Sequence, residues 1–524
     1  MAKNHRHNFR LRFTVIQKAN FSSQISHTYN LLCLIHIMNI INMKRILFFF
    51  VCVSLLLMSC KDKLSDTEEL NSYINNWVYS NMSDLYYWNT TLPVYKSTTG
   101  SPADYFKSLK YKDDRFSAIF ESYQDIANQL NGVSSAEIGF EFELYREGTS
   151  NVVGVVLYPK RGTPAEKMGI KRGDIFRKIN GEQITMSNYN TVINYMYDAT
   201  ASSEITFATS ASGVLTDLTP VTVTKVMDYK EDPVYIDTVY TVQNKKVGYL
   251  MYNFFTNDPG DKSLKYDLEL NNIIGQFDAQ GVSELIVDLR YNHGGAISSA
   301  IRLASMLVPN LTTDKVFIYT EYNKILTEYF KSTDYTSKYT DNPFVDNFAT
   351  TIDVTSPSAS YPIQNIGNKL QRIFFLTGTG TASASEMVIN GLKPFLPAVL
   401  VGDTTVGKNV GSTLVNDTKN TKNQWAMLPI ILKYFNKDYK SDFASGFAPD
   451  FYVKDRSPYY YQLGDVREAL LSKAISQISG IQTVSASKVQ SIKRTFVGSS
   501  VNFKPIRNEL IVRNKAIDSF FNRK

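Results

Sequence analysis

The sequence predicts a multidomain α/β protein with a small helical N-terminal domain, a β-rich domain and a larger core built from βαβ units. Three stretches with different residue patterns lead to this fold class. Residues 60–130 begin as a short polar tether and then read as helical, residues 135–228 contain short strand-like runs, and residues 232–478 alternate apolar strand runs with helical stretches. A chain of 524 residues is long enough for several such domains.

The N-terminal region has the layout of a secretory signal peptide. Met43-Lys44-Arg45 is a basic start, residues 46–57 form an apolar run too short to span a bilayer, and Cys60 follows directly. The arrangement over residues 43–59 is similar to a bacterial lipoprotein signal, which implies that Cys60 becomes the lipidated first residue. We therefore expect a membrane-anchored lipoprotein of the bacterial cell envelope, on its periplasmic or surface face. A non-cleaved membrane anchor is the alternative.

Removal of this region changes what the composition implies. Residues 1–42 contain no acidic side chain and no clear pattern, and we interpret them as an upstream extension from a wrongly assigned start. Residues 1–59 hold seven Lys and Arg and no Asp or Glu, so their loss lowers the basic count from 56 to 49, against 49 acidic residues. The formal charge then falls from +7 to zero, and the basic balance gives no indication of nucleic-acid binding. Cys33 and Cys52 leave with the signal, so we expect no disulfide.

The helical stretch is rich in large apolar side chains. We expect these residues to pack inside a small domain and assign them no chemistry. They are Tyr73, Trp77, Leu85, Tyr86 and Trp88.

The β-rich stretch carries an ordered set of glycine and strand motifs. Residues 162–170 read GTPAEKMGI, Gly173-Asp174-Ile175 follows, and a helix is expected near Tyr189–Tyr197. This order resembles a PDZ domain, a module that captures a C-terminal carboxylate in backbone N–H groups and adds the peptide as an extra strand. The resemblance places the carboxylate-binding loop at Ile138-Gly139-Phe140. A purely structural β-domain is the alternative.

Two apolar runs in the core predict neighbouring parallel strands. Ile373–Leu376 is followed by a glycine-rich turn and by a helix that opens at Ser383. Ala398–Val401 ends at Gly402 and leads to Lys408, 25 residues after Ser383. A strand, helix, strand order of this kind is a βαβ crossover, whose strands lie parallel and end at the same edge of the sheet. Ser383 and Lys408 are therefore expected to meet.

A third segment points to the same edge of the sheet. The buried-strand run Leu285–Leu289 stops at Arg290–Gly295, which reads RYNHGG, and a helical stretch follows. The paired glycines Gly294 and Gly295 allow backbone N–H groups to approach a substrate closely. Ala384, at a helix start, offers another N–H at the favourable end of the helix dipole. Donors of this kind suit the oxyanion that develops in acyl transfer.

Each of these motifs alone also has an ordinary structural interpretation. Ser383–Glu386 fits a capping box, in which the serine merely closes the helix start. Lys408 in a glycine-rich loop is usually a solvated surface lysine, and Gly294-Gly295 is usually a turn. Their convergence on one sheet edge favours an active site.

Together these segments resemble the carboxyl-terminal processing peptidases, the S41 family of serine proteases. The resemblance extends over about Gly139 to Leu470 and rests on four motifs: Thr381–Glu386, Gly407-Lys408, Asp288–Gly295 and Gly446–Asp450. It implies a peptidase core of the crotonase/ClpP-like kind beside the PDZ-like domain. Ser383 would be the nucleophile and Lys408 the general base. The oxyanion hole would use the N–H groups of Ala384, Gly294 and Gly295, with no metal or organic cofactor.

One position departs from the family pattern. Many members carry a glutamine four residues after the lysine, and this chain has Ser412 there. The Ser412 hydroxyl can still hydrogen-bond an amine, so it is a possible support for Lys408.

The histidine count independently favours lysine as the base. Four of the five histidines lie in the part expected to be removed, and the fifth, His293, lies in the predicted oxyanion turn. A His-rich metal site is thereby excluded, and the absence of a G-x-S-x-G motif argues against an α/β-hydrolase. A lysine base must be uncharged near neutral pH, which burial favours. We therefore expect Lys408 to be substantially buried.

These observations predict an exported serine endopeptidase acting on polypeptides with accessible C-termini, held at the membrane through Cys60 and without a nucleic-acid partner. The main alternative is a binding-only scaffold whose peptidase fold has lost turnover. A P-loop is rejected: residues 402–408 fit G-x-x-x-x-G-K, but Asn409 replaces the required Ser or Thr and residues 410–415 read as a strand.

Three further parts of the chain are predicted from pattern alone. Val234–Tyr240 and Lys246–Phe255 alternate as in a hairpin. Tyr322–Pro362 is expected to be a helical or loop excursion. Residues 479–524 form a basic C-terminal tail, expected to be solvated or partly disordered, with contact to anionic lipid as the alternative.

Overall fold

The computed structural model describes Met38 and residues 64–198, 200–211, 213–355, 358–455, 460–481, 495–503 and 515–522. Cys60 and the predicted signal segment lie outside the described residues. The chain divides into two compact units, residues 1–69 and residues 70–524. Among the described helices, none has the length and apolar character needed to cross a membrane.

The N-terminal domain combines helices with one short strand. In α2 (Asp66–Leu85) the buried residues Ile74, Val78, Met82 and Leu85 recur every three or four positions, which gives the helix a packing face. The elements after it are η1 (Asn89–Thr91), α3 (Pro102–Leu109), β1 (Ala118–Phe120) and α4 (Tyr123–Leu130). The strand β1, in a stretch expected to be helical, pairs antiparallel with β22 (Ala426–Leu428) of the core, and that partner strand lies too far away in sequence for local pattern to indicate it.

The β-rich domain has a sheet in the order β25-β3-β4-β5-β7-β8, with β6 pairing β5 and β9 pairing β7. Its core includes edge-on contacts between the rings of Phe142 and Phe176, with Phe140 close by. Gly154 is required opposite Phe176, because a Cβ there would lie 2.0 Å from the ring. The elements are β2 (Val133–Glu137), β3 (Phe140–Glu147), β4 (Asn151–Pro159), α5 (Pro164–Lys167), β5 (Ile175–Ile179), β6 (Glu182–Gln183), α6 (Tyr189–Asn194), β7 (Ser202–Ala211), β8 (Val214–Asp217), β9 (Val221–Thr224) and β10 (Val226–Lys230).

The core contains a six-stranded sheet in the order β11-β12-β13-β18-β19-β24. The predicted hairpin is confirmed as β11 (Val234–Val242) and β12 (Lys245–Tyr252), and the predicted parallel strands β13 (Val282–Asp288), β18 (Ile373–Thr377) and β19 (Ala398–Gly402) are neighbours. The edge strand β24 is Phe451–Tyr452.

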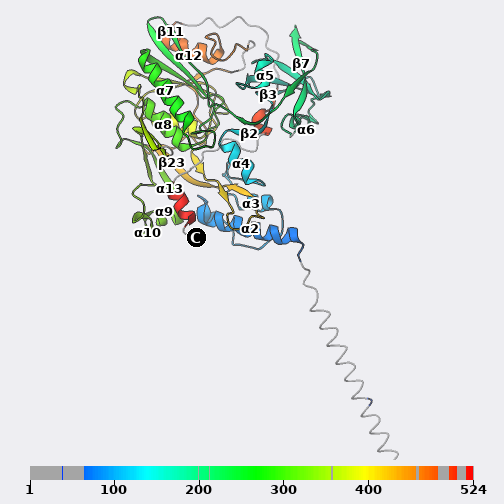
Figure 1. The fold of residues 1–524 in the computed structure, drawn as a ribbon, viewed down its shortest axis with the longest axis vertical. Coiled ribbons are helices and arrows are strands. Elements are labelled where there is room, and N and C mark those ends of the chain that lie inside the picture. Colours follow the sequence, from blue (N-terminus) through cyan, green and yellow to red (C-terminus); the bar gives the residue numbers. More distant parts are fainter. Residues whose placement is uncertain are drawn as a thin grey trace, which may run out of the picture. The chain divides into compact units, whose positions relative to one another are not determined.

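Helices cover both faces of this sheet, which explains why its strands read as continuous apolar runs. In β18, Ile373 and Phe375 pack on the face covered by α7, α8 and α11, while Phe374 and Leu376 pack on the face covered by α12. Figure 1 shows α7 and α8 side by side on one face of the sheet. The bounds of these helices are α7 (Lys265–Ala279), α8 (Ile297–Leu307), α11 (Ala384–Leu392) and α12 (Ala469–Ser479).

A second sheet, in the order β15-β14-β23-β20, lies within the same core. Its main strands are β14 (Val316–Tyr322) and β23 (Ile430–Asn436), with β20 (Val410–Ser412) following Lys408. The excursion predicted near residues 322–362 contains both helices and strands. The remaining elements are α9 (Lys324–Lys331), α10 (Thr333–Thr336), β15 (Val345–Asn347), β16 (Thr351–Thr355), β17 (Ser358–Pro362), η2 (Gly367–Lys369) and β21 (Val415–Asn416).

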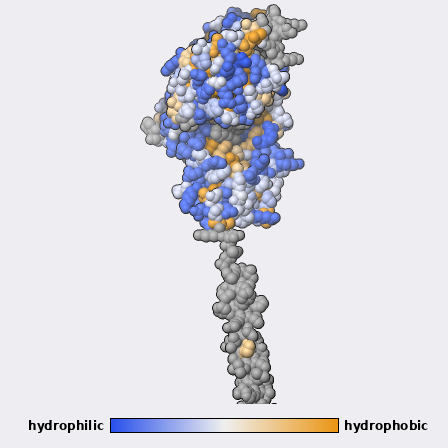
Figure 2. Space-filling model, turned by 90° about the vertical axis from the view of Figure 1, so that its right-hand side faces the viewer, coloured by the Kyte–Doolittle hydropathy of each residue, from blue (hydrophilic) through white to orange (hydrophobic). Residues whose placement is uncertain are grey.

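The described parts of the C-terminal tail are packed, which corrects the expectation of a solvated tail for these residues. The strand β25 (Thr495–Ser499) joins the β-rich domain and is followed by η3 (Ser500–Phe503). In α13 (Lys515–Asn522) the side chains of Ala516, Ile517 and Phe520 are buried. The apolar patterns of these elements are too short to be recognised among the polar and basic residues of the tail. Figure 2 shows a face of mostly hydrophilic residues, with apolar residues exposed in small groups.

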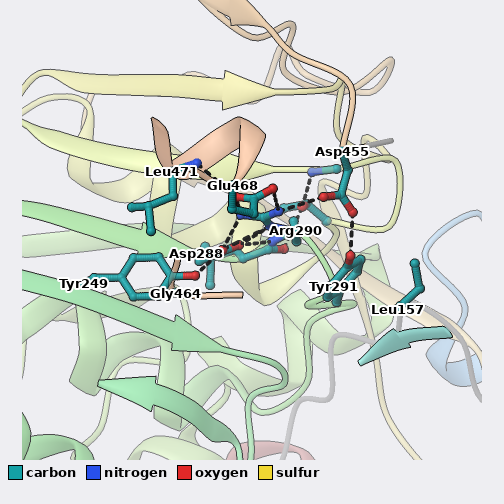
Figure 3. A network of polar contacts seen from close by, with 12 residues as sticks. Leu157, Tyr249, Asp288, Arg290, Tyr291, Asp455, Gly464, Glu468 and Leu471 are labelled. Atoms are coloured by element: carbon teal, nitrogen blue, oxygen red, sulfur yellow. Dashed lines mark hydrogen bonds and ion pairs between the residues drawn. The ribbon is translucent and has the colours of Figure 1, made fainter. Parts of the chain in front are cut away.

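A buried ionic network lies at the carboxyl end of β13 (Figure 3). Arg290 contacts Asp288 at 2.7 Å and both carboxylate oxygens of Glu468 at 2.7 and 2.9 Å. Its Nη1 also lies 2.7 Å from Asp455, which receives a further ion pair from Arg172 of the β-rich domain. Since Arg290 directly precedes the predicted oxyanion turn, this network fixes where that turn begins.

Candidate active site

Ser383 lies between the end of β18 and the start of α11, in a strained backbone conformation. Its φ of 63° and ψ of −114° correspond to the first central position of a type II′ turn, which normally takes glycine. A non-glycine residue in such a region costs about 1–3 kcal/mol, and strain of this kind concentrates at functional sites.

Only one of the two hydrogen bonds of a capping box is formed here, the one from the backbone of Ser383 to the side chain of Glu386. The Ser383 N–H donates to Oε2 of Glu386 at 2.9 Å. The Ser383 Oγ makes no cap hydrogen bond, and within the described residues it is buried without a hydrogen-bond partner. An unused buried hydroxyl is costly in an ordinary helix cap, so a purely structural role does not explain this side chain.

The carboxylate of Glu386 ties the serine turn to the lysine loop. Its Oε2 also accepts from the Lys408 N–H at 2.8 Å, and its Oε1 accepts from the Gly407 N–H and the Thr405 hydroxyl, each at 2.6 Å. Burial raises the pKa of the Glu386 carboxyl. The three donors named here and the Ser383 N–H oppose that shift. The sequence indicated Glu386 only as a helix cap, because its long-range partners have no local pattern.

Tyr434 of β23 makes a second connection between the same two segments. Its hydroxyl lies 3.2 Å from the carbonyl oxygen of Ser383 and 3.0 Å from that of Lys408. The side chain is fully buried, and burial raises the pKa of its phenol well above the usual range. Sequence reasoning missed Tyr434, since one tyrosine in an apolar strand looks like any other core residue.

Lys408 is fully buried, as the sequence predicted. The ring of Phe116 lies beneath its ammonium nitrogen, with 5.2 Å between Nζ and the ring centroid. The chain continues into β20 rather than a helix, which agrees with the rejection of a P-loop. A surface lysine is therefore the wrong interpretation of this position.

The N-terminal domain contributes to the surroundings of Lys408. Next to Phe116, the guanidinium of Arg115 donates to the carbonyl oxygens of Val406 at 2.8 Å and Ala444 at 3.1 Å. The following strand β1 pairs with β22. Arg115 and Phe116 were not predicted, because nothing in the local sequence connects residues 115–116 with a loop almost 300 positions later.

The predicted oxyanion turn lies against the serine. A Cβ added to Gly294 would lie 2.6 Å from the Ser383 Cβ and 3.0 Å from the Ala384 nitrogen. The Gly294 N–H donates to Oδ1 of Asn292 at 2.8 Å, so this donor is already engaged. The described hydrogen bonds include no acceptor for the N–H groups of Ala384 and Gly295. Of the three predicted oxyanion donors, the N–H groups of Ala384 and Gly295 are therefore better suited than that of Gly294.

Asn292 holds the predicted oxyanion turn against the segment around Ser383. Its carbonyl oxygen accepts from the Ala382 N–H at 3.2 Å and from the Ser385 hydroxyl at 3.1 Å. The Nδ1 of His293 lies 2.7 Å from the carbonyl oxygen of Gly380. His293 thus contacts the backbone of the turn that precedes Ser383.

Two further predicted residues lie in defined positions. Ser412 is fully buried in β20, where it pairs in register with Ile430, and its support for Lys408 stays a prediction. In the predicted PDZ loop, Gly139 has a φ of 97° and its N–H donates to Oε1 of Glu137 at 3.1 Å. No local pattern indicated that this donor would be engaged.

No group of three or more metal-ligating side chains occurs among residues that the structure describes. The arrangement instead brings together a buried serine, a buried lysine and two backbone N–H groups. Chemically it can hold a lysine amine and a serine hydroxyl in one buried region beside hydrogen-bond donors.

Comparison with known proteins defines the class. A sequence model of peptidase family S41 matches residues 246–453, that of the S41 N-terminal domain matches residues 73–118, and that of the PDZ domain matches residues 155–208. The chain therefore contains a peptidase core of family S41, preceded by that family's N-terminal domain and a PDZ domain.

Individual relatives are distant. The probable CtpA-like serine protease of Staphylococcus aureus strain COL is 23% identical over 358 residues, which cover 67% of this chain and 60% of that protein. The protein of the same description from Staphylococcus saprophyticus is 23% identical over 336 residues, covering 64% and 57%. The match thus spans about 60% of the relatives' length. A Bacteroides fragilis protein assigned to the S41 proteases shares the fold, with a TM-score of 0.61, 24% identity and coverage of 78% and 98%.

Proposed function

We propose that this S41 family member is an exported serine endopeptidase that cleaves polypeptides with a dyad of Ser383 and Lys408. The observation that carries the proposal is the double connection between the two residues through Glu386 and Tyr434. A packing interaction alone has no need to hold a serine with a strained backbone and an unbonded buried hydroxyl next to a buried lysine.

The proposed reaction begins with proton transfer inside the site. The uncharged amine of Lys408 takes the proton of the Ser383 hydroxyl as Oγ attacks the scissile carbonyl carbon. The N–H groups of Ala384 and Gly295 donate to the oxyanion, which Gly294 can approach closely because it lacks a side chain. The protonated Lys408 then gives its proton to the leaving amine, and water releases the acyl-enzyme by the reverse sequence.

We further propose that the PDZ domain recruits the substrate by binding an accessible polypeptide end as an added strand. The residues implied are those of the loop Ile138-Gly139-Phe140 and the strand β3 that follows it. This step supplies binding energy away from the scissile bond, which brings the chain to Ser383 without being part of the chemistry.

The experiment uses the chain from Lys61 onward and one unfolded polypeptide with either a free or an amidated apolar C-terminus. Cleavage that is lost in Ser383→Ala and in Lys408→Ala, with both variants folded, supports the dyad. Normal turnover by a folded Lys408→Ala variant contradicts it. Faster cleavage of the substrate with the free acid supports carboxylate capture by the PDZ domain. Equal cleavage of both substrates is compatible with the peptidase but contradicts recruitment through the carboxylate.

The binding-only scaffold remains the second candidate because Ser412 replaces the family glutamine. A scaffold of this kind would leave every tested polypeptide intact and would not react with a serine-directed phosphonate. Covalent labelling of the wild-type chain, absent from Ser383→Ala, would exclude the scaffold.

We also propose that Cys60 is lipidated and holds the protein at the membrane of the cell envelope. Metabolic labelling with a clickable fatty acid should mark the wild-type protein in the membrane fraction. A Cys60→Ala variant should lose the label and leave the membrane fraction, and membrane retention without the label would contradict this anchor.

A further inference from the structure

The chain's own C-terminal segment, residues 495–503, forms the edge strand of the PDZ sheet. In β25, Thr495 lies opposite Arg146 of β3 and Ser499 lies opposite Glu143. The pairing is antiparallel, so the segment runs toward the beginning of β3, where the predicted carboxylate-binding loop lies. A peptide that a PDZ domain binds as an extra strand uses this same sheet edge.

Side chains of the segment also fill the space between β3 and α6. Val497 and Phe503 pack against the buried apolar cluster that contains Phe142 of β3 and Val192 of α6. The ring of Phe503 stacks on Tyr197, just beyond α6, with 6.4 Å between centroids and 9° between planes. In Figure 1 this short orange-red segment lies next to β3. The segment therefore contacts both walls of the groove that an incoming peptide would use.

Ser500 supplies a polar anchor at the end of this strand. The residue is 1% exposed. The Phe142 N–H donates to the Ser500 Oγ at 3.2 Å, and the Ser500 hydroxyl in turn donates to Oε2 of Glu141. A solvated tail would not bury a serine in two hydrogen bonds with the domain.

The charges near the loop suit an uncharged segment. Lys160 is buried and lies within 3.1 Å of carboxylate oxygens of Glu137, Glu141 and Glu231. Although burial opposes it, the three carboxylates raise the pKa of Lys160 well above its usual range. Three negative charges around one positive charge leave this region acidic, and the Gly139 N–H is engaged by Glu137. An uncharged strand meets no electrostatic penalty there.

The next described element of the chain, α13, is packed as well. In α13, Ile517 and Phe520 are buried, and Phe520 packs on Tyr329 of α9. The Tyr329 hydroxyl lies 3.0 Å from the Ser519 Oγ. Because the segment belongs to the same chain on both sides, its effective concentration at the groove is high, and a free peptide competes at a disadvantage.

We propose that residues 495–503 are a built-in ligand that occupies the PDZ groove, so that a polypeptide recruited by the domain must first displace them. The proposal rests on the recruitment step of the proposed function, and it identifies the preferred occupant as an uncharged extended segment with an apolar side chain, a hydroxyl and a terminal aromatic ring. Access of a substrate to the PDZ domain then depends on how stably β25 pairs with β3.

Binding is measured in the Ser383→Ala chain, where no peptide can be cut. The probe is a fluorescent peptide with the sequence of residues 495–503, amidated at its C-terminus. Combining Val497→Asp with Phe503→Ser removes both apolar anchors from the chain's own segment and leaves the domain unchanged. The probe should then bind at least ~10-fold more tightly than to the parent. Thr495→Ala, on the exposed side of the same strand, is the matched control and should bind the probe like the parent.

Ser500→Ala is the milder variant, and it should give a smaller gain in the same direction. Hydrogen exchange at residues 495–500 shows whether the segment has been released. Equal probe affinity in the parent and in a variant with a released segment would overturn the proposal. In the catalytically competent chain, the released variant should lower KM for an unfolded polypeptide with kcat unchanged. Failure of the peptidase proposal would abolish turnover but leave the binding result intact, so the two are separable.

Discussion

The backbone N–H groups of Ser383 and Lys408 donate to one and the same oxygen, Oε2 of Glu386, at 2.9 and 2.8 Å. From the other direction, the hydroxyl of Tyr434 contacts the carbonyl oxygens of both residues. Two segments that follow different strands, β18 and β19, are thus fixed to each other through their backbones, while the Ser383 hydroxyl takes no part in these contacts. Such preorganisation fixes the backbone positions of the two residues of the proposed dyad.

Glu386→Gln should slow turnover through misplacement rather than unfolding. In glutamine an NH2 group replaces one carboxylate oxygen, and this group cannot accept a hydrogen bond. It would face a donor of the serine turn or the lysine loop, so one of these two segments must shift. A shift of about 1 Å at a catalytic pair costs up to about 100-fold in rate. We expect kcat to fall about 10- to 100-fold with KM little changed, measured by steady-state kinetics on an unfolded polypeptide. The matched control is Glu69→Gln, an exposed change on α2, which should leave kcat as in the parent. A Glu386→Gln variant with unchanged kcat would remove Glu386 from the positioning role.

Ser383→Gly and Ser383→Ala should both lack activity but differ in stability. The backbone of residue 383 has a positive φ of 63°, which glycine adopts without strain and alanine does not. Strain of about 1–3 kcal/mol is relieved in the glycine variant, and part of this gain is offset by the greater freedom of glycine in the unfolded chain. We expect the free energy of unfolding to be about 1 kcal/mol higher for Ser383→Gly than for Ser383→Ala, measured by urea denaturation. An equally stable pair would mean that the turn relaxes when the serine is lost.

Phe116→Ala should impair the proposed base without touching the substrate. The Phe116 ring lies 5.2 Å from the Lys408 Nζ, and its removal leaves a cavity into which the lysine side chain can shift. We expect kcat to fall about 10-fold with KM little changed, measured by steady-state kinetics on an unfolded polypeptide. Phe116→Leu, which keeps an apolar group there, should preserve most of the activity. A Phe116→Ala variant with the kcat of the parent would show that Phe116 does not position Lys408.

Local pattern was sufficient for the elements that carry the site. The strands β13, β18 and β19 are short apolar runs that end in glycine or polar residues, and burial on both faces of a parallel sheet makes such runs recognisable. Their common direction then placed Ser383 and Lys408 at one edge. The burial of Lys408 also followed, because a lysine base requires it.

The features that could not be predicted depend on contacts between distant parts of the chain. Tyr434 and Phe116 reach the site from a separate sheet and from the N-terminal domain, and neither lies in a pattern that differs from ordinary core packing. The strand β25 was hidden by the basic residues around it, since a strand that completes another domain's edge needs only a few apolar positions. The assignment of Gly139 to the PDZ loop stays a prediction, and its hydrogen bond to Glu137 could not be predicted because it depends on side-chain geometry.

Removing one charge from the buried ionic network around Arg290 should strongly lower the free energy of unfolding. Glu468 accepts two hydrogen bonds from Arg290 and also caps α12 through the Leu471 N–H at 3.0 Å. Removing one member of a buried ion pair typically costs about 3–5 kcal/mol because the other charge stays buried. Glu468→Ala should lower the free energy of unfolding by about this amount in urea denaturation. Asp465→Ala, which loses an exposed pair with Arg467, should cost less than about 1 kcal/mol. Similar losses in both variants would show that the network is not strongly coupled.

Asp346 in β15 should make the protein less stable as the pH rises through the weakly acidic range. Burial, together with the neighbouring charge of Asp341, raises its pKa from 3.8 to about 6. The folded protein therefore binds more protons than the unfolded chain between about pH 4 and pH 6, so the free energy of unfolding falls over this window and is constant above it. Asp346→Asn removes the falling part of the curve, and at pH 7 it should stabilise the protein by about 1–2 kcal/mol, since partial exposure of the side chain reduces the full effect. Urea denaturation between about pH 4 and pH 8 measures this difference, with the exposed Asp113→Asn as a control that keeps the slope of the parent. A variant at Asp346 with the parent's slope would assign the pH dependence to other carboxylates.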